Sequence, residues 1–150
     1  MMKKRLKWIG YSIGLVCVLA VVMFTLWLLS YPSRIVNNGE LFLRQAFQPG
    51  KDAYPCIHEG TWATWYFAGT RGLPTLTKLS HDASLSPYGR DLATNLYRYI
   101  STGQHLRTVR WELAHGELPL LGRYYYNRLL RDDTIYLKQR GLPIPQGEEP

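Results

Sequence analysis

Cys56, His58 and Glu59 form the one tight cluster of reactive residue types in the chain. A thiol, an imidazole and a carboxylate can supply a nucleophile with its base, or part of a metal site. Nucleophilic catalysis also needs an oriented base and a donor for the oxyanion, and nothing in the sequence nominates these groups. We therefore favour a structural interpretation, in which Cys56 is tucked inward and the neighbouring His58–Glu59 pair is solvated.

Metal binding is the second chemistry that these residue types suggest. The zinc-protease motif is excluded, because Trp62 stands where a second histidine must follow His58 by one helical turn. A closed zinc site takes about four ligands, and Cys56, His58, His81 and Asp82 would supply that number. Their spacing matches no recognised zinc pattern, so we predict no metal and no other cofactor.

Arginine and tyrosine interleave near the C-terminus. The stretch includes Arg123, Tyr124, Tyr126, Arg128 and Arg131. Such a mixture suits single-stranded nucleic acid, lipid headgroups or the centre of a protein interface. The alternative is ordinary helix amphipathicity, in which Leu121, Tyr125 and Leu129 face a core and the arginines are solvated. We predict these five residues as a binding surface for another protein.

A long apolar run near the N-terminus is expected to anchor the chain, and with it these candidate residues, at a membrane. Residues 8–29 carry no charge and come after the basic residues Lys3, Lys4, Arg5 and Lys7. A helix of this length rises about 33 Å, enough for a hydrocarbon core of about 30 Å. Signal-peptide cores are shorter, about 7–15 residues, and precede a small-residue cleavage site that is missing here. We therefore predict one uncleaved transmembrane helix.

The charges around this run predict its orientation. Four basic residues precede it, whereas only Arg34 and Arg44 lie in the first fifteen residues after it. This bias favours a cytoplasmic N-terminus and an extracytoplasmic C-terminal domain at the inner membrane. The inverted topology, with a basic and aromatic domain in the cytoplasm, is the alternative. Gly10 and Gly14 have the spacing that can support a homodimer through the membrane helix.

Length, charge and cysteine content constrain the part of the chain beyond the anchor. About 117 residues remain, which is one domain. Fourteen Lys and Arg residues against eleven Asp and Glu leave this part at +3, so we expect no nucleic-acid partner. Cys56 has no partner for a disulfide, since Cys17 lies in the apolar run. The predicted organisation is a basic N-terminus (1–7), a transmembrane helix (8–29), a small globular domain (30–145) and a flexible tail (146–150).

The domain is predicted to be mainly α, either all-α or α+β. Ser86 caps a helix that begins at Pro87 and ends before Gly103, with an apolar face of Tyr88, Leu92, Leu96, Tyr99 and Ile100. Further helices are predicted over 104–115, which ends at Gly116, and over 118–140. Asp132 and Asp133 suggest a break or a new cap inside the last helix.

The segments nearer the anchor are less regular in sequence. Asn38 is predicted to cap a short helix within 33–47. The prolines and Gly50 predict a loop over 48–55, and 71–86 is predicted to be irregular. Residues 61–68 are predicted as a buried strand or a short helix.

These observations favour a function without identifying it. We expect a single-pass membrane-anchored accessory protein that docks or regulates a larger bacterial envelope complex, of a secretion, transfer, division or immunity type. A membrane-tethered enzyme using Cys56 and His58 is the alternative from another class. The sequence leaves enzymatic activity open and favours a non-enzymatic role.

Overall fold

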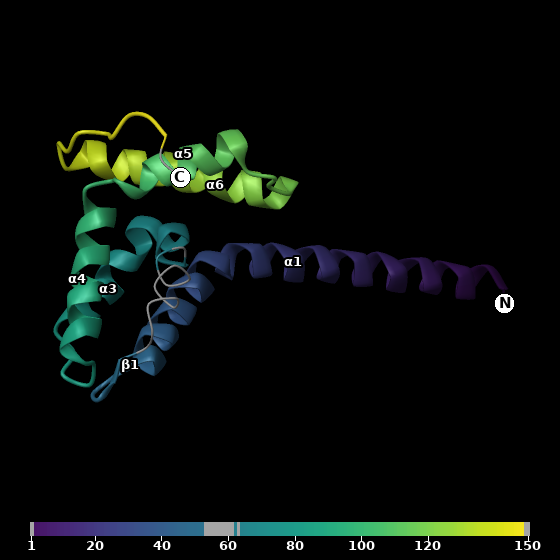
Figure 1. The fold of residues 1–150 in the computed structure, drawn as a ribbon. Helices are drawn as coiled ribbons and strands as arrows, with labels where there is room; N and C mark the ends of the chain where they lie inside the picture. The colour runs from purple at the N-terminus through teal and green to yellow at the C-terminus, as the bar shows by residue number, and fades with distance from the viewer. Residues whose placement is uncertain (1, 53–61, 63, 149–150) are drawn as a thin grey trace. The chain divides into compact units, whose positions relative to one another are not determined.

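The computed structural model describes residues 2–52, 62 and 64–148, and it confirms that the chain is mainly helical (Figure 1). The elements are α1 (Met2–Ala46), β1 (Phe47–Gln48), β2 (Lys51–Asp52), η1 (Gly69–Gly72), α3 (Leu73–Ser80), α4 (Pro87–Ser101), α5 (His105–His115) and α6 (Leu120–Gln139). Two compact units are present, Met1–Tyr31 and Pro32–Pro150. Cys56, His58 and Glu59 lie outside the described residues.

The first unit is the N-terminal part of α1, and it exposes large apolar side chains. Phe24 and Trp27 stack with ring centroids 6.1 Å apart, and the ring centroids of Trp27 and Tyr31 are 6.4 Å apart. Among the described residues, no single helix is both long and apolar enough to cross a membrane. The segments Leu15–Trp27 and Leu29–Ala46 meet the length and composition requirements only as a pair joined at a bend. The membrane span therefore stays a prediction.

Pro32 gives a physical reason for this bend. Proline has no N–H, so it cannot donate to the carbonyl four residues earlier, which belongs to Leu28. Its ring also crowds that carbonyl, and a proline inside a helix favours a kink at this point. Because α1 continues to Ala46, the predicted start of a separate helix at Asn38 is wrong. Asn38 lies inside the helix and its side chain is exposed.

Trp65 is the centre of the core of the second unit and is fully buried. Its indole lies between two glycines, Gly39 of α1 and Gly72 of η1. A Cβ atom at either glycine would lie 2.9 Å from the ring, so no larger residue fits without displacing it. Leu43, Leu76, Leu79, Leu96 and Ile100 fill the surrounding space. Residues 64–68 are helical, which settles the predicted choice between strand and helix for this part.

The segment predicted as a loop contains a small antiparallel hairpin. Phe47 is paired with Asp52 and Gln48 with Lys51, and Gly50 takes a φ of +76° in the turn. The Phe47 carbonyl accepts a hydrogen bond of 2.8 Å from the Ser86 backbone N–H. This bond ties the hairpin to the start of α4.

Helix α4 has the predicted ends. The Ser86 hydroxyl accepts a 3.1 Å hydrogen bond from the Gly89 N–H, and Pro87 occupies the first turn. Gly103, at a φ of +78°, comes just after the helix. The predicted apolar face is buried at Leu92, Leu96 and Ile100, whereas Tyr99 is half-buried and Tyr88 is 43% exposed.

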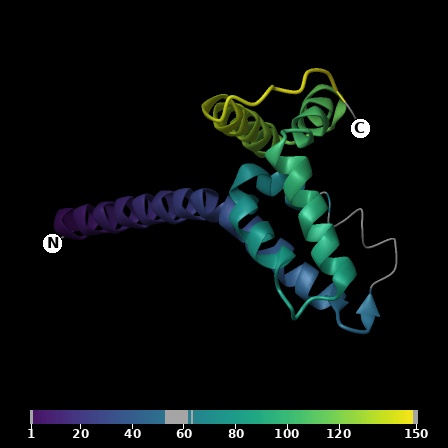
Figure 2. The same cartoon turned by 90° about the vertical axis from the view of Figure 1, so that its left-hand side faces the viewer.

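The prediction that 71–86 is irregular is wrong for residues 71–80, which contain the end of η1 and all of α3, and is confirmed for residues 81–86. Pro74 favours a loop by its residue type, but it stands in the first turn of α3, where a helix needs no N–H donor. Leu73, Leu76 and Leu79 form the buried face of α3. Helices α3 and α4 lie side by side (Figure 2).

Helices α5 and α6 form a second packed pair (Figure 1). Helix α5 ends at Gly116 as predicted. Helix α6 runs without interruption through Asp132 and Asp133, so the predicted break or cap there is wrong. The chain after α6 returns along α5, where the Arg110 guanidinium donates to the Pro145 carbonyl.

Candidate interaction surface on α6

The first two turns of α6 expose large apolar side chains next to an arginine. Leu120 is 87% exposed, Leu121 52% and Tyr124 63%. Residues three or four positions apart are neighbours on a helix surface, so Tyr124 lies next to both Leu121 and Leu120 and joins them into one patch. We call Leu120, Leu121, Arg123 and Tyr124 the α6 docking surface.

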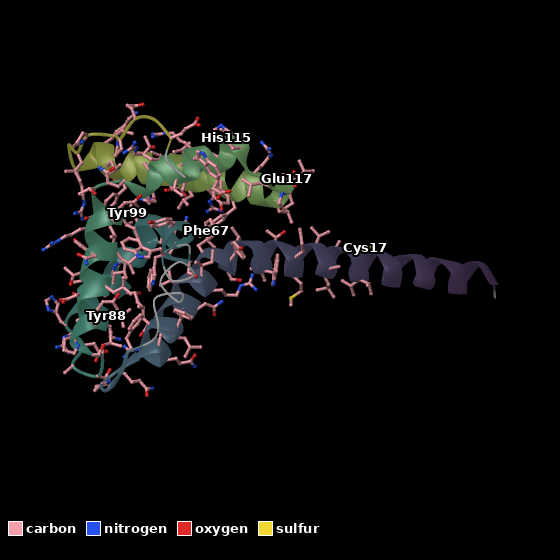
Figure 3. All side chains as sticks on the ribbon, viewed as in Figure 1. Cys17, Phe67, Tyr88, Tyr99, His115 and Glu117 are labelled. Atoms are coloured by element: carbon pink, nitrogen blue, oxygen red, sulfur yellow. The ribbon has the colours of Figure 1, made fainter. Side chains whose placement is uncertain are left out.

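Arg123 reaches from this surface toward α5. Its guanidinium donates to the Leu113 carbonyl over 3.4 Å, near the C-terminal end of α5. Figure 3 shows His115 and Glu117 where the chain leaves α5. The side chain of Arg123 is exposed, so its remaining N–H donors face solvent. The docking surface thus combines apolar contact area with a fixed positive charge.

The middle of α6 carries a separate group of charges. Asp132 accepts hydrogen bonds from Arg71 of η1 at 3.2 Å and from Arg131 at 3.0 Å. The Nε of Arg128 lies 3.6 Å from the same carboxylate. We call Arg71, Arg128 and Arg131 the arginine cluster. Its members are 41%, 31% and 69% exposed.

A buried polar network lies beneath this surface and is centred on Asp133. Its carboxylate accepts from the Thr70 N–H at 3.0 Å and from the Thr70 hydroxyl at 2.5 Å. The Nε2 of His105 lies 2.7 Å from the same carboxylate. Gly69, at a φ of +56°, leaves the space for Asp133, because a Cβ there would overlap its carboxylate. The network joins η1, α5 and α6.

This network contains the residue types of a hydrolase site but not the required arrangement. In such a site the nucleophile is hydrogen-bonded to the histidine that acts as its base. Here the Thr70 hydroxyl and the His105 ring are both hydrogen-bonded to Asp133. His105 is fully buried and Asp133 is 1% exposed, so a substrate cannot reach either group. We interpret the network as a structural connection between helices.

The predicted binding surface is divided by the structure. Arg123, Tyr124 and Arg131 are exposed and Arg128 is half-buried. Tyr126 is only 7% exposed and packs edge-on against Phe67 with ring centroids 5.1 Å apart, so its assignment to the surface is wrong. Of the alternative inward stripe, Leu129 is buried and Tyr125 half-buried, and Tyr125 donates to the Phe67 carbonyl.

Leu120, Leu121 and Arg71 are surface residues that the sequence patterns did not indicate. Helical spacing assigned Leu121 to the core, although the neighbouring leucines at the start of a helix after Pro119 were a readable signal. Arg71 is sixty-one residues from Asp132, and no local pattern indicates that contact.

The remaining candidates do not form a site in the described part of the chain. No group of three or more His, Cys, Asp or Glu residues is placed there to hold a metal. Asp82 instead contacts Arg44 at 2.7 Å and accepts two bonds from Ser84. The hydrogen bonds from the Ser84 hydroxyl and backbone, and then from Arg44, lower the pKa of Asp82 to about 2. His81 is exposed.

Comparisons of the chain with protein-family models, curated proteins and solved structures found no match. The surface geometry is therefore the basis for the functional proposal.

Proposed function

We propose that this chain is a single-pass membrane-anchored accessory protein whose C-terminal domain docks a larger envelope complex through the α6 docking surface. The observation that carries the proposal is the exposure of Leu120, Leu121 and Tyr124 beside Arg123. Contiguous exposed apolar side chains mark interaction sites, and Tyr and Arg are enriched among residues that dominate binding energy.

The anchor is supported by the composition of α1. The run over residues 8–29 is free of charge, and its described large apolar side chains are exposed within the first unit. Trp27 and Tyr31 stand at its C-terminal end, where amphipathic rings suit a headgroup layer. A tethered domain meets membrane partners at high effective concentration, so a small docking surface suffices for association.

The chemistry of the surface indicates what it would bind. The leucine and tyrosine side chains would pack into an apolar groove on the partner. Arg123 would donate hydrogen bonds to a carboxylate or carbonyl at the edge of that groove. We therefore expect a membrane-protein partner with an apolar groove bordered by acidic residues.

Site-specific photocrosslinking tests this proposal in cells. A photoreactive residue at Leu120 should capture one defined membrane protein, and Arg123→Ala with Tyr124→Ala should reduce that capture at least about tenfold, as expected for two interface residues of about 1 kcal/mol each or more. A photoreactive residue at Ile135, which is 47% exposed on the same helix, is the matched control. Equal capture from both positions, or no effect of the double substitution, contradicts the docking role.

The orientation rests on the charge bias and is tested separately. A reporter active only outside the cytoplasm, fused after residue 150, should be active. Activity of a cytoplasmic reporter alone would favour the inverted topology and a partner on the cytoplasmic side.

A further inference from the structure

Three arginines from two separate segments converge on one carboxylate in the second unit. Arg71 comes from η1, and Arg128 and Arg131 come from α6. All three contact Asp132, at distances of 3.0–3.6 Å. One acidic side chain therefore holds three guanidinium groups together at the surface.

The cluster has more donors than its own acidic residues can use. Each guanidinium carries five N–H donors, whereas a carboxylate offers about four lone-pair positions. Asp133 lies next to Asp132, but its oxygens are engaged by Thr70 and His105 inside the domain. Counting both carboxylates against the three arginines leaves one net positive charge and many unused donors.

A small pocket adjoins this cluster, and its lining contains the first residue of the second unit. The lining residues are Pro32, Arg71, Tyr125, Arg128, Leu129, Asp132 and Asp133. Pro32 is buried in the second unit and comes directly after Tyr31 in the chain. The pocket is thus lined by Arg71, by Arg128 and by Pro32, which follows the predicted anchor closely in sequence.

The position of Pro32 in the chain relates this pocket to the membrane surface. Pro32 is three residues beyond Leu29, which is a rise of about 4.5 Å along a helix. The headgroup region adds about 5–7 Å on each side of the hydrocarbon core. Pro32 therefore falls within the headgroup layer when residues 8–29 span the core.

We infer that the arginine cluster binds the phosphate of an anionic phospholipid headgroup at the end of the membrane helix. This inference rests on the proposed anchor but not on the docking surface or on the orientation, since both leaflets contain phospholipid. Arginine matches a phosphate with paired N–H donors, and basic pockets beside membrane helices recognise lipid headgroups. Asp132 holds the guanidinium groups in place and competes with the phosphate for their donors.

Native mass spectrometry of the full-length chain in a mild detergent tests this inference, with phosphatidylglycerol as the probe. The substitutions Arg71→Gln and Arg128→Gln together should lower the affinity for retained lipid about tenfold, because each basic residue near a headgroup contributes to attraction. Arg98→Gln with Lys138→Gln removes the same charge from exposed positions of α4 and α6 and should leave retention unchanged. Equal loss in both double variants would show a nonspecific charge effect and overturn the inference.

Asp132→Asn provides a test with the opposite sign. Removing the competing carboxylate charge frees guanidinium donors, so lipid retention should rise, whereas a purely structural role of the cluster predicts a fall or no change. This variant distinguishes the two roles even where the arginine substitutions unfold the domain.

Inorganic phosphate separates the two sources of the same chemical group. At millimolar concentration it should compete only weakly with retained lipid. Binding of phosphate by the cluster without any lipid retention would overturn the lipid assignment. Failure of this test leaves crosslinking at Leu120 unaffected, so the two proposals can fail independently.

Discussion

Asp133→Ala should strongly destabilise the C-terminal domain, because one carboxylate joins three elements there. The substitution leaves the half-buried Thr70 N–H and the fully buried Nε2 of His105 without their 3.0 Å and 2.7 Å partners. Each orphaned buried group costs about 1–3 kcal/mol, and removal of one partner from a buried pair costs about 3–5 kcal/mol. We expect a loss of about 4 kcal/mol in the free energy of unfolding.

A loss of this size is large for a domain of this length. For about 117 residues, each kcal/mol shifts the midpoint by roughly 3–5 °C, so the Tm should fall by about 10–20 °C. Thermal unfolding of the full-length chain in detergent, monitored by near-UV circular dichroism, measures the change. The buried Trp65 and its neighbouring rings supply the signal.

The adjacent residue gives a matched control. Asp132 is 30% exposed and its contacts are surface ion pairs, so Asp132→Ala should cost less than about 1 kcal/mol. A Tm for Asp133→Ala within the range of Asp132→Ala would refute the claim that the buried network connects the helices.

Two further predictions concern the core and the pH dependence of stability. Gly39→Ala places a Cβ 2.9 Å from Trp65 and should cost about 1–3 kcal/mol in denaturant unfolding; a neutral effect would show that the indole moves freely. Hydrogen bonds from Ser84 and then from Arg44 lower the pKa of Asp82 to about 2. Its carboxylate therefore stabilises the fold above the unfolded-state pKa of about 4, and this stabilisation is lost as the pH falls toward 2. The stability difference between the native chain and Asp82→Asn should therefore narrow between about pH 4 and pH 2, and a constant difference contradicts this origin.

Local signals in the sequence predicted helix ends well. Ser86, Pro87 and Gly103 act within one turn of the chain, so their meaning does not depend on the rest of the fold. Pro74 led to a wrong prediction of irregular structure, because a proline can either end a helix or begin one. The burial of Leu73 and Leu76 shows that Pro74 begins α3.

Contacts between distant segments were beyond the reach of the sequence. The paired acidic residues Asp132 and Asp133 suggested a helix break, because the partners that make Asp133 a core residue lie 28 and 63 positions away. Three consecutive tyrosines likewise do not reveal which one is buried. Tyr126 faces inward because Phe67 meets it there, and this contact depends on the tertiary fold.

The candidate surface was predicted in part. Arg123, Tyr124 and Arg131 are exposed as expected, since a helix with few inward positions must present such residues to solvent. Helical spacing did not separate the apolar docking surface from the arginine cluster. That separation depends on where α6 begins and on the arrival of Arg71 from η1.

Alkaline extraction of membranes from cells producing the full-length chain tests the central claim, which is permanent tethering by residues 8–29. The chain should stay in the membrane pellet and release only with detergent, and its N-terminal peptide should still include residues 1–7. Recovery of the chain in the carbonate supernatant, or a mature polypeptide that begins near Tyr31, would contradict the account.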